Sequence, residues 1–133
     1  MPIRNSIGAF KVDLNDFAKK MDLDIADARR RVGLEIYEGV IAMTPRKTGR
    51  AEKGWNFSDI APDFTVPPPG EYVGGGNVGP PSNDPFGQSF VANAVPYIFA
   101  LEYGHSSQAP FGMVRVTLAE VAEGIQAPSG RFR

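Results

Sequence analysis

The sequence lacks cysteine and has a single histidine, His105, among its 133 residues. Without thiols the chain can form no disulfide, and no thiolate can act as a nucleophile or bind a metal. A zinc or iron site would need carboxylates for nearly all of its ligands, because one histidine supplies only one imidazole. We therefore expect no catalytic residue, no metal ion and no cofactor.

An excess of one charge is also missing. The chain has 14 Lys and Arg against 15 Asp and Glu, for a net charge of -1. No overall basic field therefore attracts nucleic acid. Two local basic clusters are present, one at Arg29 to Arg31 and one at Arg46 to Lys53. They lack aromatic interleaving and a recognition motif, which favours a solvated face or contacts between subunits over a nucleic-acid-binding module, our second hypothesis.

Long hydrophobic runs are absent as well. No apolar run reaches the roughly 18 residues of a membrane-spanning helix, and Met1 to Lys11 lack the compact apolar region of a signal peptide. We therefore expect a protein made and kept in a cytoplasm, with no membrane partner. Its 42% hydrophobic and 22% charged residues are typical of a globular domain, and its length predicts one domain, 1–133.

Two helices are predicted in the first third of the chain. Asp13 to Met21 carries apolar residues at helical spacing, with Asp13 placed as its cap. A long helix then runs from the cap Asp24 to about Met43 and ends at Thr44-Pro45, because proline donates no backbone N–H. Its main apolar stripe comprises Ile25, Ala28, Val32, Ile36, Val40 and Met43.

A second set of apolar residues, Leu34, Tyr37 and Ile41, lies on a neighbouring face of this long helix. Two interpretations are open, and amphipathicity alone favours neither. The helix either buries one side in its own domain and offers the other to a second molecule, or simply has a wide core face.

Arg50 to Ser58 alternates in a way that predicts a strand packing Trp55 onto the long helix. From Pro62 to about residue 89 the composition shifts to proline and glycine, and only Tyr72 and Val73 suggest a short extended piece. Loops of this length are usually functional, or disordered until a partner binds. We expect this loop to be mobile in an isolated subunit and ordered in an assembly.

The last third of the chain predicts three further elements. Phe90 to Val95 indicates a strand whose register cannot be read, because both faces are apolar. Tyr97 to Tyr103 follows as a short helical turn. Met113 to Ile125 has the spacing of a helix, although a strand over Met113 to Leu118 is an alternative because valines alternate there. The tail, Ala127 to Arg133, is expected to fray.

Two patterns could suggest chemistry. Glu102, His105 and Ser106 lie close in sequence, but a nucleophile needs its base within hydrogen-bond reach and an oxyanion site beside it, and the spacing of a nucleophile elbow is absent. The run Gly74 to Gly76 lacks the preceding strand, the following helix and the lysine of a phosphate loop, so a flexible connector is favoured. A hydrolase built on Glu102 and His105 is our third hypothesis, with the least support.

Several short blocks together resemble one family. Thr44 to Arg50, TPRKTGR, followed by Gly54-Trp55, resembles the T-P-x-x-T-G-x-L signature of tail-component proteins of lambda-like siphophages, in which a long helix precedes the signature. Asn93 to Pro110 is similar to the family's N-x-x-x-Y-A-x-x-x-E-x-G run with its trailing Ala-Pro, and Gly112 to Arg115 resembles the start of its final helix. Ala51 and Ile98 depart from the leucine and alanine common in the family, which leaves the subfamily open.

The resemblance implies a small α+β subunit, with a long N-terminal helix packed on a small antiparallel sheet, a short helix and a C-terminal helix. It implies a structural virion protein that joins phage head to tail in the neck as one unit of a ring, a hexamer, assembled in the host cytoplasm. Its partners would be the connector or stopper and the tail terminator or tail tube proteins, with DNA passing through the lumen without specific binding. A tail terminator and a head-side stopper or adaptor are alternative positions in the same connector.

A ring needs heterologous contacts, in which one patch binds a different patch on the neighbour. We expect Glu102, at the end of its short helix, to form an ion pair with the Arg46 to Lys53 cluster, within or between subunits. The alternative is an exposed Glu102 worth about 1 kcal/mol or less. The predicted interface residues are Leu34, Tyr37, Ile41, Arg46, Arg50, Tyr72 and Glu102.

Overall fold

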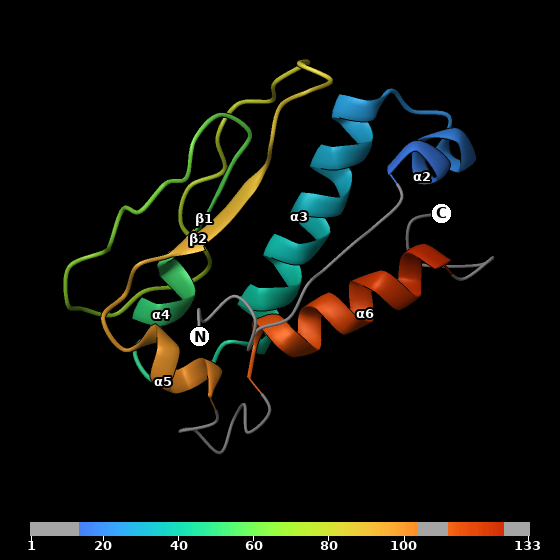
Figure 1. Cartoon of the computed structure of the whole chain (residues 1–133). Coiled ribbons are helices and arrows are strands. Elements are labelled where there is room, and N and C mark those ends of the chain that lie inside the picture. Colours follow the sequence, from blue (N-terminus) through green and yellow to red (C-terminus); the bar gives the residue numbers. More distant parts are fainter. Residues whose placement is uncertain (1–13, 104–111, 127–133) are drawn as a thin grey trace, which may run out of the picture.

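The computed structural model describes residues 14–103 and 112–126, and it confirms the predicted α+β class (Figure 1). Asp13, Gly104, the His105 to Pro110 loop and the tail from Ala127 lie outside the described residues. The helix α3 stands between the two-stranded sheet on one side and α2 and α6 on the other. The elements in chain order are α2 (Leu14–Met21), α3 (Ile25–Met43), α4 (Arg50–Lys53), β1 (Trp55–Ser58), β2 (Phe90–Asn93), α5 (Ile98–Glu102) and α6 (Val114–Gln126).

The spine of the fold, α3, begins and ends where the sequence predicts. The Asp24 carboxylate accepts a hydrogen bond from the Asp27 backbone N–H at 2.8 Å, which satisfies one of the unpaired amides of the first turn. At the other end the Thr44 hydroxyl donates to the Val40 carbonyl at 2.5 Å. Pro45 follows directly, so the helix cannot continue.

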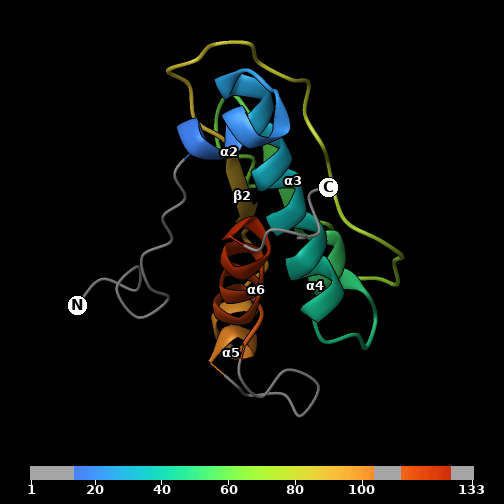
Figure 2. The same cartoon turned by 90° about the vertical axis from the view of Figure 1, so that its right-hand side faces the viewer.

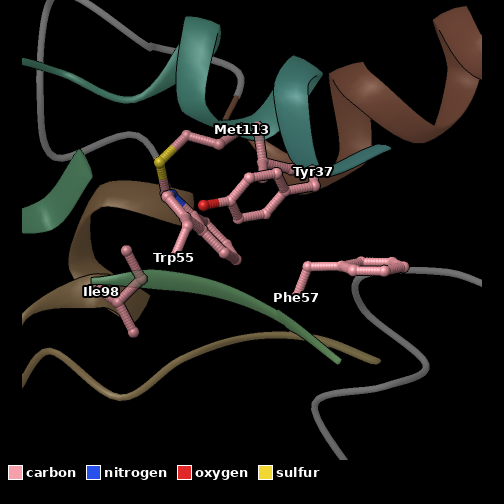
Figure 3. Packing of buried hydrophobic residues seen from close by; sticks show 6 residues of the cluster. Tyr37, Trp55, Phe57, Ile98 and Met113 are labelled. Atoms are coloured by element: carbon pink, nitrogen blue, oxygen red, sulfur yellow. The ribbon is translucent and has the colours of Figure 1, made fainter. Parts of the chain in front are cut away.

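Two apolar clusters lie on opposite sides of α3. The first fills the space between α3 and the sheet, and Figure 3 shows its members Tyr37, Trp55, Phe57, Ile98 and Met113. The second joins α2, α3 and α6 through Phe17, Ala18, Ala28, Val32 and Val121. Figure 2 shows α6 running beside α3, so the helix prediction for Met113 to Ile125 is confirmed and its strand alternative is wrong.

The predicted packing of Trp55 on the long helix is confirmed. Its side chain is buried, and the indole Nε1 donates to the Thr44 hydroxyl at 2.8 Å. This bond pairs a polar group that burial would otherwise leave without a partner. It also joins the start of β1 to the residue that ends α3.

The predicted strand Arg50 to Ser58 is wrong in its first half. Gly49 has a φ of 85°, in the left-handed region, and the chain then makes the helical turn α4. The backbone N–H of Lys53 donates to the Gly49 carbonyl at 2.9 Å. Four alternating residues are a weak strand signal when all of them favour helix over strand, as Arg, Ala, Glu and Lys do.

The structure shows the register of the two strands, which could not be read from the sequence. In the antiparallel pair β1–β2, Trp55 lies opposite Asn93 and Phe57 opposite Val91. Phe57 is buried and Val91 packs on the same cluster, so both face α3. Ala92, the next residue along β2, therefore points to the other face of the sheet. The second strand ends at Asn93, two residues earlier than predicted.

Residues 59–89 form a long segment without helix or strand, apart from one isolated bridge between Val78 and Phe57. Around that bridge the Phe57 N–H donates to the Asn77 carbonyl at 2.8 Å, and the Gly79 N–H donates to the Phe57 carbonyl at 2.9 Å. Residues 76–79 thus run parallel to β1, on the edge opposite β2. The extended piece of this segment lies here, and not at Tyr72-Val73 as predicted.

Candidate functional site

The second apolar face of α3 packs inward. Tyr37 is 6% exposed and belongs to the first cluster, while Leu34 and Ile41 are half-buried against it. Burial raises the pKa of the Tyr37 phenol. An added Cβ at Gly75 would collide with Tyr37 and Ile41, so the long segment covers this face. Of the two interpretations, the wide core face is the one observed, and the three residues offer little surface to a partner.

Arg46, Arg50 and Tyr72 come together, as members of one anchoring site. The Arg46 guanidinium donates to the Tyr72 carbonyl at 3.3 Å, and the Tyr72 N–H donates to the Thr48 carbonyl at 2.7 Å. Arg50 Nε donates to the Pro67 carbonyl at 2.9 Å. The turn between α3 and β1 therefore fastens the middle of the long segment, which removes the main reason to expect that segment to be mobile in an isolated subunit.

Gly49 is required at this anchoring site for two reasons. Its φ of 85° is strained for any residue with a side chain. An added Cβ would also collide with the Tyr72 carbonyl oxygen. The motif TPRKTGR thus has a physical role in this chain, since it stops α3, turns the backbone and holds the long segment.

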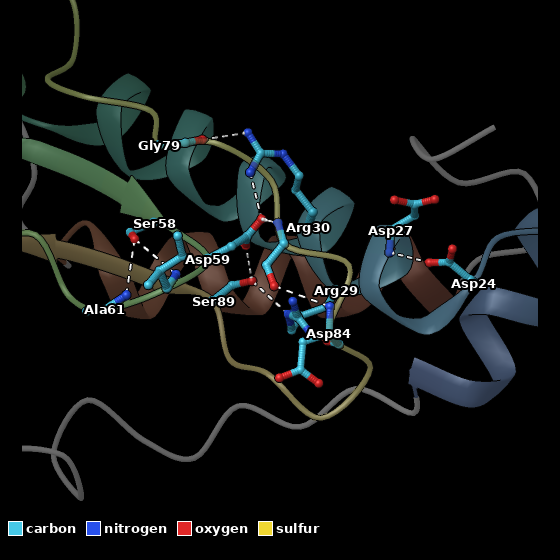
Figure 4. Close-up of polar contacts among 12 residues, drawn as sticks. Asp24, Asp27, Arg29, Arg30, Ser58, Asp59, Ala61, Gly79, Asp84 and Ser89 are labelled. Carbon is cyan, nitrogen blue, oxygen red and sulfur yellow. Dashed lines mark hydrogen bonds and ion pairs between the residues drawn. The ribbon is translucent and has the colours of Figure 1, made fainter.

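The first basic cluster is largely engaged in a polar network (Figure 4). Arg30 forms an ion pair with Asp59 at 2.6 Å and donates to the Gly79 carbonyl at 3.0 Å. Arg29 is buried, and it donates to the Ser89 hydroxyl at 3.0 Å and to the Asp84 carbonyl at 2.9 Å. Two of the three arginines therefore hold both ends of the long segment to α3.

Asp59 is the centre of this network. Burial raises the pKa of its carboxyl, but hydrogen bonds from Ser89 and Arg30, together with the Arg30 charge, outweigh that effect and hold the pKa below its usual range. The Ser89 hydroxyl donates to Asp59 at 2.5 Å. The hydrogen bond between Ser89 and Asp59 was not predicted from the sequence. The only available signal was that Asp59 follows β1 and Ser89 precedes β2, so antiparallel pairing brings them together.

Glu102 is neither exposed nor paired with the Arg46 to Lys53 cluster of its own chain, so the exposed alternative and the ion pair within a subunit are both wrong. The residue is 2% exposed. One carboxylate oxygen accepts the backbone N–H groups of Met113 and Val114, each at 2.8 Å. The other accepts the N–H of Arg115 at 3.2 Å and its guanidinium Nε at 3.0 Å. The Arg115 guanidinium also donates to the Glu102 carbonyl.

This arrangement makes Glu102 the cap of α6. A carboxylate at a helix N-terminus satisfies free amides and is favoured by the helix dipole. Each of its oxygens already accepts two hydrogen bonds, so the group is not poised as a general acid or base. Arg46 in turn pairs with Glu52 at 3.6 Å. His105 lies outside the described residues.

Exposed apolar side chains gather on the long segment. Phe86 is 92% exposed, and four others on this segment are at least half exposed: Ile60, Phe64, Val73 and Val78. A further exposed aromatic group, Tyr97, Phe99 and Tyr103, lies on and beside α5. Large exposed apolar side chains of this kind are candidates for contact with a partner.

Within residues 14–103 and 112–126, no group of three or more His, Cys, Asp or Glu side chains could hold a metal ion. In the same part of the chain, no helix is both long and apolar enough to cross a membrane. Comparison of the chain with known protein families, curated proteins and solved structures finds no match.

Proposed function

We propose that this chain is a structural subunit of a tailed-phage virion that joins head to tail in the neck, acting as one unit of a ring. The observation that carries the proposal is the set of exposed apolar side chains on the long segment, including Phe86 and Val73. Hydrogen bonds fasten this segment to α3 and to the turn after it, so its apolar groups are held outward on a fixed support. Such a surface is stabilised when neighbouring copies or virion partners cover it.

The resemblance to phage tail-component proteins supplies the particular role. One of its blocks, Thr44 to Arg50, builds the turn that anchors the long segment, so this block and the segment with the exposed apolar side chains are physically connected. Tail completion is the position that the resemblance favours. A tail terminator and a head-side stopper or adaptor are the alternatives within the same connector.

The other two hypotheses gain less from the geometry. A nucleic-acid-binding module would use Arg29 and Arg30, but Arg29 is buried and Arg30 is paired with Asp59. A purely structural subunit should show no salt-dependent shift of short duplex DNA at low ionic strength. A hydrolase built on Glu102 would need a carboxylate free to exchange a proton. Both carboxylate oxygens of Glu102 instead accept hydrogen bonds from the first residues of α6.

Deletion of the gene from the phage genome that carries it tests the proposal. Negative-stain electron microscopy of the lysate should show filled heads and separate tails, and purified protein added to the lysate should restore joined particles. Normally joined, infectious particles in the deletion lysate would contradict a joining role. Cryo-electron microscopy of the complete particle would then separate tail completion from the terminator and stopper positions.

A further inference from the structure

The outer edge of β2 can be identified from the hydrogen bonds of β1. Trp55 and Phe57 use their backbone groups on the side of residues 76–79, since Gly76 N–H donates to the Trp55 carbonyl and Phe57 N–H donates to the Asn77 carbonyl, both at 2.8 Å. Backbone groups alternate sides along a strand. Asn56 and Ser58 therefore face β2 and bond their register partners, Ala92 and Phe90.

It follows that the backbone N–H and C=O groups of Val91 and Asn93 point away from β1, to the outer edge of β2. No backbone hydrogen bond to either residue from that side occurs in the described part of the chain. The strand also lacks the usual protection of an edge, since Phe90 to Asn93 contains no charge, no proline and no bulge. Such an edge is a template for an added strand.

The sheet has a second, different edge. Asn77 and Gly79 make the bonds to Phe57, so the N–H and C=O groups of Val78 point outward on the other side. The Val78 side chain is 50% exposed. Two unlike edges on one sheet allow a contact that repeats from copy to copy in one direction, as a ring requires.

We infer that a second copy of this chain covers the β2 edge, with residues 76–79 of one copy pairing with Phe90 to Asn93 of the next. This inference deepens the proposed function and rests on it. The five exposed apolar side chains of the long segment together expose on the order of 600 Å². A stable interface buries roughly 800 Å² on each partner, so the segment that carries the Val78 edge exposes apolar area on the scale that such an interface needs. The net charge of -1 opposes self-association only weakly.

Two substitutions, one on each edge, test the pairing. Ala92→Lys adds a charge to the β2 edge on the face away from α3, and Val78→Pro removes the outward N–H of the other edge while leaving the bonds of Asn77 and Gly79 to Phe57. Each variant should raise the dissociation constant for self-association by about tenfold or more. Gln88→Lys and Asn83→Pro are the matched controls. Both positions are exposed, neither side chain makes a described hydrogen bond, and both variants should associate as the wild type does.

Analytical ultracentrifugation of mixtures gives the decisive result. Each edge variant alone should be monomeric, but an equimolar mixture should form a heterodimer, because one partner keeps an intact β2 edge and the other an intact Val78 edge. A mixture that stays monomeric overturns the inference, as does association of either variant at wild-type strength. Dimers of Val78→Pro alone would show that β2 pairs with β2, which also overturns it. Circular dichroism and thermal unfolding establish that both variants are folded.

Hydrogen exchange on the wild-type chain needs no variant. The Val91 and Asn93 amides should exchange more slowly at high protein concentration than at low concentration, because pairing protects them. Equal exchange rates, or a wild-type chain that is monomeric at every concentration, would overturn the inference. A joining role could survive that outcome, since the deletion phenotype is measured independently. Wild-type association through these edges together with normal particles in the deletion lysate would refute the role and leave the interface intact.

Discussion

Replacing Glu102 with alanine should be among the most destabilising single changes in the chain. The carboxylate is 2% exposed and accepts hydrogen bonds from the N–H groups of Met113, Val114 and Arg115. Alanine would leave these amides without a partner at the start of α6. It would also remove the partner of the Arg115 guanidinium, which lies 3.0 Å from the carboxylate.

The magnitude follows from these contacts. Loss of a helix cap costs about 1 kcal/mol, and loss of hydrogen bonds to a buried charged group costs about 1.5–3 kcal/mol. The Arg115 side chain is 36% exposed and can be rehydrated, so the full penalty of a broken buried ion pair does not apply. We expect a loss of about 3 kcal/mol in the free energy of unfolding, equivalent to a fall of about 10 °C in Tm for a domain of this size.

Urea unfolding followed by circular dichroism measures this loss, and Glu120→Ala is the matched control. Glu120 is also on α6, but it is exposed, so its replacement should change stability by less than about 0.5 kcal/mol. Glu102→Gln should fall between the two, because it keeps an oxygen acceptor and loses the charge. Equal stability of the Glu102→Ala and Glu120→Ala variants would refute the assigned cap.

Three other predictions concern the anchoring of the long segment and the core. Gly49→Ala should lower the free energy of unfolding by at least twice the roughly 1 kcal/mol expected for Gly74→Ala. Both glycines have positive φ, but of the two only Gly49 would place its Cβ against another atom, the Tyr72 carbonyl oxygen. Equal losses in thermal unfolding would disprove the collision. Trp55→Phe and Thr44→Val should each lose about 1–2 kcal/mol, and their double mutant should lose less than the sum, because both remove the same Trp55–Thr44 hydrogen bond and only Thr44→Val also removes the bond to the Val40 carbonyl. The folded pKa of Asp59 lies below its unfolded value of about 3.9, so its stabilising contribution is present above that pH and is lost as the pH falls through the folded pKa; acid unfolding should therefore begin below about pH 4 and be shallower in Asp59→Asn.

The parts of the fold that were predicted correctly depend on local signals. The two ends of α3 were predicted from Asp24 and Thr44-Pro45, because caps and prolines act within one helical turn. The stretch with periodic apolar residues that forms α6 was long enough to favour a helix. The four residues of α4, from Arg50, were too few to show a helical period. The backbone pairing of residues 76–79 with β1 could not be predicted, because this glycine-rich stretch has no alternation of apolar and polar side chains.

The candidate site was harder to predict because its contacts join distant residues. Tyr37 was identified as part of a second apolar face of α3, but its burial depends on distant residues, Phe57 of β1 and Gly75 of the long segment. The charge of Glu102 indicated an ion pair, but its partner Arg115 stands 13 positions away on an element whose orientation the sequence does not encode locally. Arg46, Arg50 and Tyr72 were predicted as interface residues, which stays a prediction; the contacts seen for them lie within the chain and link the turn to the long segment.

Quantitative mass spectrometry of purified, joined particles tests the proposed virion role most directly. The account predicts that the chain is present in a constant copy number equal to a single ring, with cross-links from one copy to another and to a connector or tail protein. Particles that are joined and infectious but contain none of this chain would contradict it.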